Sequence, residues 1–600
     1  MSFFLHHLLR HGYDMFWSHF LIFWLLILVA IAVCGWYLAG STDAARPAPA
    51  QGPLTALPKP SPSLADITAG MVLIGFLVLY TYIAFYKEDF AHYDNDNLID
   101  FSLRGVNFPV AVWPYIGRFL PLQYQEWNLI RFITRSCTGY TVFSMAQVAI
   151  LVAALWIILD EYKFRYRVAI LISAMLVPSF VVSNASLVCP ERNVLFWLTI
   201  ILLCLYRYSR TRARKYFVGS LVATHFALYY KETVVVVVLA YVVARLLVEG
   251  YTSWRVGQRS WQQFARQNSL TLGLLAVSGI YLVLFGLAML PQHRFSYIND
   301  NQAPLASVFL RYLQTAWLPF LVIPVLILRF SRFALGKGQF DDLWDCLAVG
   351  ATACFLSLLA LRMYGGYYTA PADLIALLYL ARVSLSWLSK PTRFRVALVA
   401  AAFMCVLVHN AAYSTFAVIE TKSTVAMKRE LSEFLRTYSP SVSGRGLTLY
   451  FPYADGFSVM GFCAYLSYKG FQVPMEGLTA PQTGPTLAVE GAATFANNRC
   501  VWYRNYACAH VESPREGALI IVLPDDRVSE ADVAGIGRHA DLLLSAEAPV
   551  LRSRIGPWLK LLTAISPRFS NSGLPGHWLQ LHVFKLGPFH LPTVAPSYKG

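Results

Sequence analysis

Long apolar stretches fill most of the first 416 residues of this 600-residue chain. A helix needs about 20 mostly apolar residues to cross the hydrocarbon core of a bilayer. Hydrophobic residues make up 57% of the chain and charged residues only 14%, which excludes a disordered chain, a fibrous repeat and an ordinary cytosolic enzyme. The sequence therefore predicts a polytopic α-helical membrane protein with about twelve transmembrane helices. The predicted spans are 16–38, 68–86, 139–159, 168–184, 193–208, 216–230, 233–248, 269–290, 308–329, 343–363, 369–387 and 395–416.

Clusters of Lys and Arg between the spans predict which loops face the cytoplasm. They lie at 163–167, 207–215, 255–266, 329–337 and 390–395, and they alternate with loops that are poorer in basic residues. The net charge of +16 therefore belongs to cytoplasmic loops. We expect no nucleic acid as partner, because the chain has no zinc-knuckle, helix-turn-helix or RNP pattern.

Composition divides the chain into three parts. Residues 1–66 hold an extra N-terminal transmembrane helix and a Pro-rich linker, and 67–418 hold the other spans and a first outward loop at 87–138. Residues 419–600 are more hydrophilic, and their short apolar runs at Leu447–Phe451 and Ala518–Leu523 predict the strands of an outward-facing α/β domain. A disulfide between Cys500 and Cys508 is expected there, with two buried thiols as the alternative.

The outward loop 87–138 concentrates residues that indicate chemistry. The aspartates Asp94 and Asp96, flanked by amides, can take a proton from a sugar hydroxyl or hold a divalent metal such as Mg or Mn. Arg104 and Arg118 follow, and a guanidinium matches a phosphate in bidentate fashion. A solvated acidic loop, which also contains Asp89 and Asp100, is the alternative interpretation.

Further outward turns carry ionisable residues at the ends of spans. Such residues are costly at membrane depth unless they are paired or solvated, so they are candidates for a functional site. The alternatives are snorkelling to the interface and an internal ion pair, such as Glu191 with Lys231. The candidates are Glu191, Arg192, Lys231, Glu232 and Arg294.

The order of these residues resembles the GT-C superfamily of integral-membrane glycosyltransferases. The pattern is similar to that of bacterial serotype-converting O-antigen glucosyltransferases and related polytopic sugar transferases, over about residues 68–416. The residues that carry the resemblance are the acidic pair Asp94 and Asp96, then Arg104, then Gly117-Arg118, and Lys231-Glu232 at a span end.

The resemblance implies a GT-C-like enzyme of the bacterial inner membrane with a periplasmic C-terminal domain. A polyprenyl-phosphate sugar is then the donor, with its phosphate held by Arg118, Arg192 or Lys231. A periplasmic glycan or lipid is the acceptor and loses its proton to Asp94 or Asp96. A metal at these two aspartates is optional, because a lipid-phosphate leaving group needs none in principle.

Two other functions remain open for the same architecture. The first is a polysaccharide polymerase or ligase that uses a lipid-diphosphate donor. The second is a transporter or flippase, for which we expect internal repeats and broken helices with polar residues near the middle of the membrane. The sequence has no clear internal repeat, and its outward charges gather at one face, which argues against transport.

Overall fold

The computed structural model describes most of the first 438 residues and a set of shorter segments after them. The described residues are 19–43, 63–86, 88–90, 98–103, 105–113, 118–185, 187–255, 260–289, 304–338, 340–388, 392–438, 447–451, 462, 465–466, 468–469, 475–479, 499–503, 506–510, 518–522, 530–547 and 580–586. The backbone alone is described at 41–43, 100, 113, 314, 416, 420, 447–448, 475–479, 499–503, 506–510, 530–532, 547, 580 and 586.

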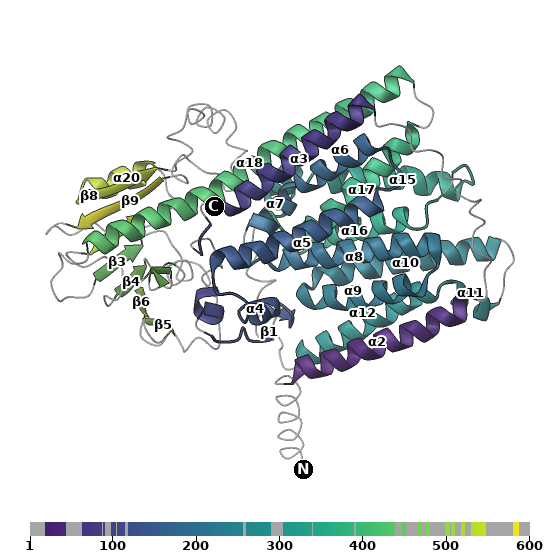
Figure 1. The fold of residues 1–600 in the computed structure, drawn as a ribbon, viewed down its shortest axis with the longest axis horizontal. Helices are drawn as coiled ribbons and strands as arrows, with labels where there is room; N and C mark the ends of the chain where they lie inside the picture. Colours follow the sequence, from purple (N-terminus) through teal and green to yellow (C-terminus); the bar gives the residue numbers. More distant parts are fainter. Residues whose placement is uncertain are drawn as a thin grey trace, which may run out of the picture.

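A bundle of apolar helices forms the larger part of the molecule, and a mixed β-sheet lies at one end of it (Figure 1). The helices follow the apolar runs of the sequence, because a helix satisfies its own backbone polar groups inside a bilayer. They are α2 (Phe20–Asp43), α3 (Leu64–Phe85), α5 (Cys137–Ile158), α6 (Phe164–Met175), α7 (Pro178–Ala185), α8 (Pro190–Thr211), α9 (Arg214–Tyr230), α10 (Thr233–Arg255), α11 (Trp261–Gln267), α12 (Ser269–Met289), α14 (Leu305–Thr315), α15 (Leu318–Ala334), α16 (Trp344–Ala360), α17 (Ala370–Trp387) and α18 (Arg393–Tyr438).

Each predicted span falls on one of these helices or on a bent pair of them. Among the described residues, seven helices are long and apolar enough to cross a membrane, and up to nine spans result if each bent pair is one span. α9 and α16 have 17 residues each and α17 has 18, so they are short for a span. The number of twelve spans therefore stays a prediction.

Two predicted spans are bent in the structure. The span predicted at 168–184 is the pair α6 and α7, which meet at 60°, and the span at 308–329 is the pair α14 and α15, which meet at 90°. Pro178 begins α7, and proline has no backbone N–H with which to continue the hydrogen bonds of the preceding helix. Hydrophobicity measures the length of an apolar run and not its direction, so the sequence did not predict these bends.

The extra N-terminal helix α2 packs along α9 and α12 at the side of the bundle (Figure 1). Its inner face is aromatic: Trp24 stacks on His225 with ring centres 5.1 Å apart, and Phe20 contacts Phe119 edge-on at 5.8 Å. Leu26, on the other face of α2, is 62% exposed, as expected for a side chain that faces lipid. The α2 helix therefore braces the bundle from one side.

The outward loop between α3 and α5 is folded against the helix ends. Its elements are the π-helix η2 (Leu98–Leu103), the antiparallel strands β1 (Ala111–Trp113) and β2 (Arg118–Leu120), and α4 (Gln125–Ile130). The backbone N–H of Leu122 donates to the carbonyl of Tyr229 at 3.1 Å, and the Asn128 side chain bonds both backbone polar groups of Phe108. These bonds fix the loop on the end of α9 and within itself.

The last helix, α18, runs for 46 residues from the bundle to the sheet (Figure 1). The predicted span 395–416 covers only its first part, and the predicted domain boundary at 418 lies inside this continuous helix. Met427, Leu431 and Leu435 are spaced four residues apart, which places them on one face. All three are fully buried in a core that the outward loop shares.

A seven-stranded sheet lies beyond α18. The order is β5-β6-β4-β3-β7-β9-β8, with parallel pairing from β6 through β7 and antiparallel pairing at both edges. The strands predicted at Leu447–Phe451 and within Ala518–Leu523 are present as β3 and β7. The strands are β3 (Leu447–Phe451), β4 (Met475–Thr479), β5 (Arg499–Tyr503), β6 (Tyr506–His510), β7 (Leu519–Val522), β8 (Ala540–Glu547) and β9 (Gln580–Leu586).

The interior strand β7 is buried on both of its faces. Leu519 and Ile521 point into the core shared with α18, whereas Ile520 and Val522 pack with Ile536 of α20 (Glu530–Gly537). A strand that is covered on both sides is apolar throughout, which explains the unbroken apolar run in the sequence.

Candidate functional site

A cavity of about 400 Å³ lies between α3, α5, the α6–α7 pair and α18. Most of its wall is apolar, with Phe76, Leu79 and Val418 among the lining residues. The charged residues Glu88, Asp89 and Lys422 also line it. We call this space the Glu88 cavity.

Glu88 stands just beyond the end of α3 and faces the start of α5. The hydroxyl of Thr138 donates a hydrogen bond to Oε1 of Glu88. Oε2 of Glu88 is buried and has no hydrogen-bond partner among the described residues. A carboxylate with one oxygen held and the other available is suited to accept a proton from a bound hydroxyl group.

Asp89 differs from its neighbour because its carboxylate is occupied. Oδ1 accepts from the backbone N–H of Phe90 at 2.8 Å. Oδ2 accepts from Nζ of Lys469 at 2.7 Å and from the hydroxyl of Tyr465 at 3.1 Å, and Nε of Arg429 lies 3.8 Å away. These bonds satisfy Asp89, so that of the two described acids lining the cavity it is Glu88 that has an available oxygen.

Lys422 brings a positive charge to the same place from α18. Its Nζ donates to the backbone carbonyl of Ala84 at 2.9 Å, in the last turn of α3, where carbonyl groups have no partner within the helix. Lys422 also interacts electrostatically with Glu88. Among the described residues that line the Glu88 cavity, Lys422 is the one cation.

A second hollow of about 790 Å³ adjoins the Glu88 cavity between α3, α5 and α6. Tyr80 and Met145 line both spaces. The other residues around this hollow are nearly all apolar, with Leu73, Val148 and Trp156 among them. The two spaces therefore share part of their walls, and the second extends the apolar lining along α3, α5 and α6.

Four of the predicted site residues form two ion pairs. Nε of Arg118 lies 3.1 Å from Oε1 of Glu232, and this oxygen also accepts from the backbone of Phe119 at 3.2 Å. Nζ of Lys231 lies 2.8 Å from Oε1 of Glu191, and both side chains are at most 6% exposed. The internal Glu191–Lys231 pair, which the sequence left as an alternative, is therefore confirmed.

Arg192 is 2% exposed and lies behind the wall of the Glu88 cavity. Its Nη1 donates to the hydroxyl of Ser144 at 2.8 Å, and Ser144 lines the cavity. Its Nη2 lies 3.9 Å from Oε1 of Glu126, and the guanidinium stacks over the Trp127 ring. Burial raises the pKa of Glu126, and the charge of Arg192 opposes that shift.

None of five predicted residues lines the cavity itself: these are Arg118, Glu191, Arg192, Lys231 and Glu232.

Four predicted residues, Asp94, Asp96, Arg104 and Arg294, lie outside the described residues, so their roles stay predictions. The predicted disulfide is described only by its backbone: the register of β5 and β6 places Cys500 directly opposite Cys508. Within the described ranges, no group of three His, Cys, Asp or Glu gathers that could hold a metal ion.

The sequence did not single out Glu88, Lys422 or Lys469 as site residues. Glu88 directly precedes Asp89 in the acidic loop. It is the first acid after α3 among the described residues, and this position could have marked it as a candidate. Lys422 meets the end of α3 across 338 positions of the chain, and Lys469 meets the acidic loop across 380. Only the folded structure shows such contacts.

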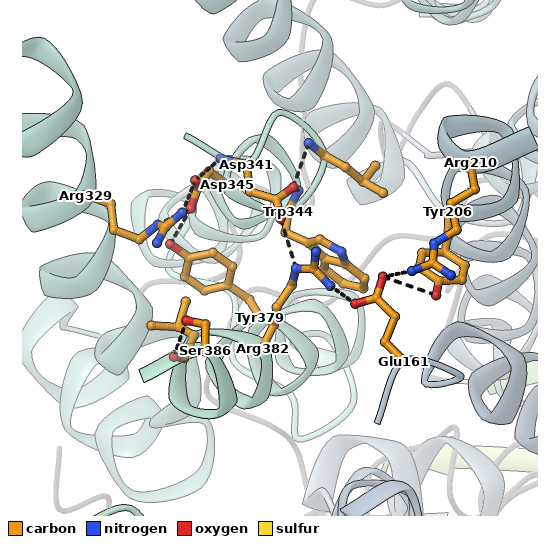
Figure 2. A network of polar contacts seen from close by, with 12 residues as sticks. Glu161, Tyr206, Arg210, Arg329, Asp341, Trp344, Asp345, Tyr379, Arg382 and Ser386 are labelled. Carbon is orange, nitrogen blue, oxygen red and sulfur yellow. Dashed lines mark hydrogen bonds and ion pairs between the residues drawn. The ribbon is translucent and has the colours of Figure 1, made fainter. Parts of the chain in front are cut away.

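A second charged cluster, drawn in Figure 2, includes Glu161, which lies just beyond the C-terminal end of α5. Arg382 donates to Glu161 at 2.8 Å and to Asp341 at 2.9 Å, and thereby links two turns of the bundle. Asp345, fully buried, accepts from Arg329 at 2.6 and 2.7 Å and from other donors. Figure 2 shows Arg382 reaching between the Glu161 turn and the Asp341 turn, and we call this cluster the Arg382 network.

Comparison with solved structures finds similar folds, among them two crystal structures of ArnT from Cupriavidus metallidurans. One is in the apo state, with a TM-score of 0.40, and the other is bound to undecaprenyl phosphate, with a TM-score of 0.39. Each is 11% identical and covers 86% of this chain and 98% of that chain. No protein-family model and no curated protein sequence matches this chain.

Proposed function

We propose that this chain is a membrane glycosyltransferase that moves a sugar from a lipid-linked phosphate donor to a periplasmic glycan or lipid. The observation that carries the proposal is the Glu88 cavity, in which two carboxylates and Lys422 stand at the end of an apolar space between membrane helices. A ligand that fits such a space has an apolar chain and a polar, anionic head. A sugar joined to a lipid by phosphate has this chemistry.

The reaction needs a base for the acceptor and a positive charge for the leaving group. The acceptor hydroxyl oxygen attacks the anomeric carbon while its proton passes to Oε2 of Glu88, the oxygen that has no partner among the described residues. The bond from that carbon to the phosphate oxygen breaks, and the phosphate keeps the electron pair. Lys422 lies where it can balance this charge, and the displacement inverts the anomeric carbon.

The sequence-based candidates for the base, Asp94 and Asp96, belong to the same loop as Glu88. They stay candidates, together with a Mg or Mn ion that they would hold. The geometry favours Glu88 over Asp89, the other acid that lines the cavity, because Asp89 is occupied by Lys469 and Tyr465. The proposal therefore makes a choice among acids that mutagenesis can test.

The orientation in the proposal is that of a bacterial inner-membrane protein whose Glu88 cavity faces the periplasm. The Arg382 network supports this orientation. Arg210 and Arg329 come from two turns that the sequence predicts to be cytoplasmic, and both arginines belong to this one cluster, as expected if the two turns lie on the same side of the membrane. α5, 22 residues or about 33 Å long, begins at the charged end of the cavity and ends beside the cluster. Cavity and basic turns thus lie at opposite ends of a span.

The test is replacement of Glu88 by Gln in the full-length protein, expressed in cells that lack the native gene. Mass spectrometry of the cell-surface glycans then measures the sugar that the wild-type protein adds. Loss of a general base lowers transfer by about 10²- to 10⁴-fold. Glu433→Gln, on the exposed side of α18, is the matched control and leaves transfer unchanged.

Asp94→Asn and Asp96→Asn, made separately, complete the test. Normal transfer by Glu88→Gln, with loss in one of the aspartate variants, would move the base to that aspartate. Identical glycans with and without the wild-type protein would contradict glycosyl transfer altogether.

A further inference from the structure

The C-terminal part of the chain shares a hydrophobic core with the outward loop. Phe90, which follows the two acids of the cavity, is 1% exposed, and its ring meets that of Tyr468 edge-on at 5.4 Å. The same core continues through α18 into the central strands of the sheet. Its buried members include Phe90, Leu98, Trp127 and Tyr140 from the loop side and Leu431, Phe451, Phe462, Tyr465 and Leu519 from the C-terminal side.

Polar contacts from this core end on one carboxylate, that of Asp89. Lys469 and Tyr465 lie one helical turn apart, with the backbone N–H of Lys469 donating to the Tyr465 carbonyl at 3.0 Å. Both side chains donate to Oδ2 of Asp89, at 2.7 and 3.1 Å. The Tyr465 side chain is 1% exposed and that of Lys469 is 36% exposed, so the pair reaches Asp89 from inside the protein and from its surface.

From these contacts we infer that Lys469 and Tyr465 are positioning residues for Glu88, which they hold in place through its chain neighbour Asp89. The inference rests on the proposed function, because Glu88 needs a fixed position only if it acts on a substrate. Adjacent Cα atoms are about 3.8 Å apart across a trans peptide, so a fixed Asp89 restrains the backbone of Glu88 directly.

This role explains why two adjacent acids have such different surroundings. Among the described residues, Thr138 is the hydrogen-bond partner of the Glu88 carboxylate, on one oxygen. The Asp89 carboxylate instead contacts three side chains, two from the C-terminal part and one from α18. A base that is displaced by about 1 Å can lose 10²-fold in rate. The C-terminal part of the chain is thereby a component of the site rather than a separate appendage.

The experiment compares Lys469→Met, Lys469→Arg and Tyr465→Phe with wild type in the full-length protein. Lys585→Met, at an exposed lysine on β9, is the control for loss of a charge in the same region. Three quantities are measured: the amount of folded protein in the membrane, binding of polyprenyl phosphate to the purified protein in micelles, and the sugar added to cell-surface glycans.

If Lys469 positions the base, its loss lowers sugar transfer but leaves the amount of folded protein and the binding of polyprenyl phosphate nearly unchanged. If its role is purely structural, all three quantities fall together. Lys469→Met lowers sugar transfer per folded molecule by about 10²-fold, while polyprenyl phosphate binds within about two-fold of wild type, since the variant disturbs the base and not the lipid site. Lys469→Arg restores most of the transfer, because a guanidinium also donates to a carboxylate. Tyr465→Phe lowers transfer by about five-fold, since one of the two bonds remains.

The outcomes that would overturn the inference are distinct from those that would overturn the proposed function. Unchanged transfer by Lys469→Met in an active wild-type background removes the positioning role alone. So does a loss of transfer that follows the loss of folded protein or of polyprenyl phosphate binding in proportion. A wild-type protein that neither binds polyprenyl phosphate nor changes the glycans removes the proposed function and the inference together.

Discussion

The Glu88 cavity and the Arg382 network both place acids beside cations, at opposite ends of α5, but their polar atoms are used differently. In the network, Asp345 is fully buried and accepts two bonds from Arg329, one from Tyr379 and one from the backbone of Asp341. In the cavity, Oε2 of Glu88 is buried without a partner among the described residues. One cluster is complete in itself, and the other leaves an acceptor available.

The difference shows which charges at membrane depth indicate a site. A buried charge is costly, so natural proteins pair most of them, and a satisfied pair has no capacity left for a ligand. Glu191 and Lys231 follow the pattern of the network, because they form a close and buried pair. An acid that lines a cavity and keeps a free oxygen is the rarer feature and the better guide to chemistry.

The largest effect that tests this contrast is expected from Arg329→Met. The substitution leaves the Asp345 carboxylate buried with hydrogen bonds but without its cation. Asp345 is fully buried, although Arg329 is 27% exposed. A buried carboxylate that loses its cation costs about 3 to 5 kcal/mol, so the free energy of unfolding falls by up to that amount and less protein accumulates in the membrane. Thermal unfolding of the purified protein in micelles measures the change.

Arg332→Met is the matched control for this experiment, since Arg332 is exposed and lies three residues further along α15. We expect it to leave the unfolding temperature unchanged. We also expect Arg329→Met to keep normal sugar transfer per folded molecule. A stable Arg329→Met protein that has lost transfer would mean that the network takes part in the reaction, and the contrast between the two clusters would be wrong.

A smaller effect is expected from Lys422→Met at the Glu88 cavity. A hydrogen bond to a charged group contributes about 1.5 to 3 kcal/mol, so loss of the ammonium weakens binding of polyprenyl phosphate by about ten-fold or more. Binding to the purified protein in micelles is the measurement, and Lys422→Arg restores it in large part. Unchanged affinity in Lys422→Met would show that the lipid phosphate binds elsewhere.

The helices could be predicted from the sequence because their signal is local. The apolar run at 139–159 matches α5, which spans Cys137–Ile158, to within two residues at each end. The end of α18 could not be predicted in the same way, because the apolar run stops at 416 and the helix continues to Tyr438. That continuation is amphipathic and is stabilised by packing against the sheet and the outward loop, which hydropathy does not register.

The candidate site could be predicted only as far as its loop. Acids after the second span marked the segment that also carries Glu88 and Asp89, yet the choice among these acids depends on partners that are distant in sequence. Asp89 is occupied because Lys469 reaches it across 380 positions, and Lys422 reaches the end of α3 across 338. Such pairs leave no periodic or local pattern, so the sequence treated Asp94 and Asp96 as the more informative acids.

The smallest effect is expected from Arg382→Met, in the part of the network that water reaches. The Arg382 side chain is 29% exposed and its partners Glu161 and Asp341 are 27% and 29% exposed, so solvent weakens both ion pairs. Exposed ion pairs contribute about 0.2 to 1 kcal/mol each, and we expect a loss of about 1 kcal/mol in the free energy of unfolding, well below that of Arg329→Met. Thermal unfolding at low and at high salt measures this loss and its screening.

A loss as large as that of Arg329→Met, or one that salt does not reduce, would contradict the prediction. It would show that burial does not determine how much each ion pair of this network contributes to the free energy of unfolding. The contrast with the Glu88 cavity would then rest on the free oxygen of Glu88 alone.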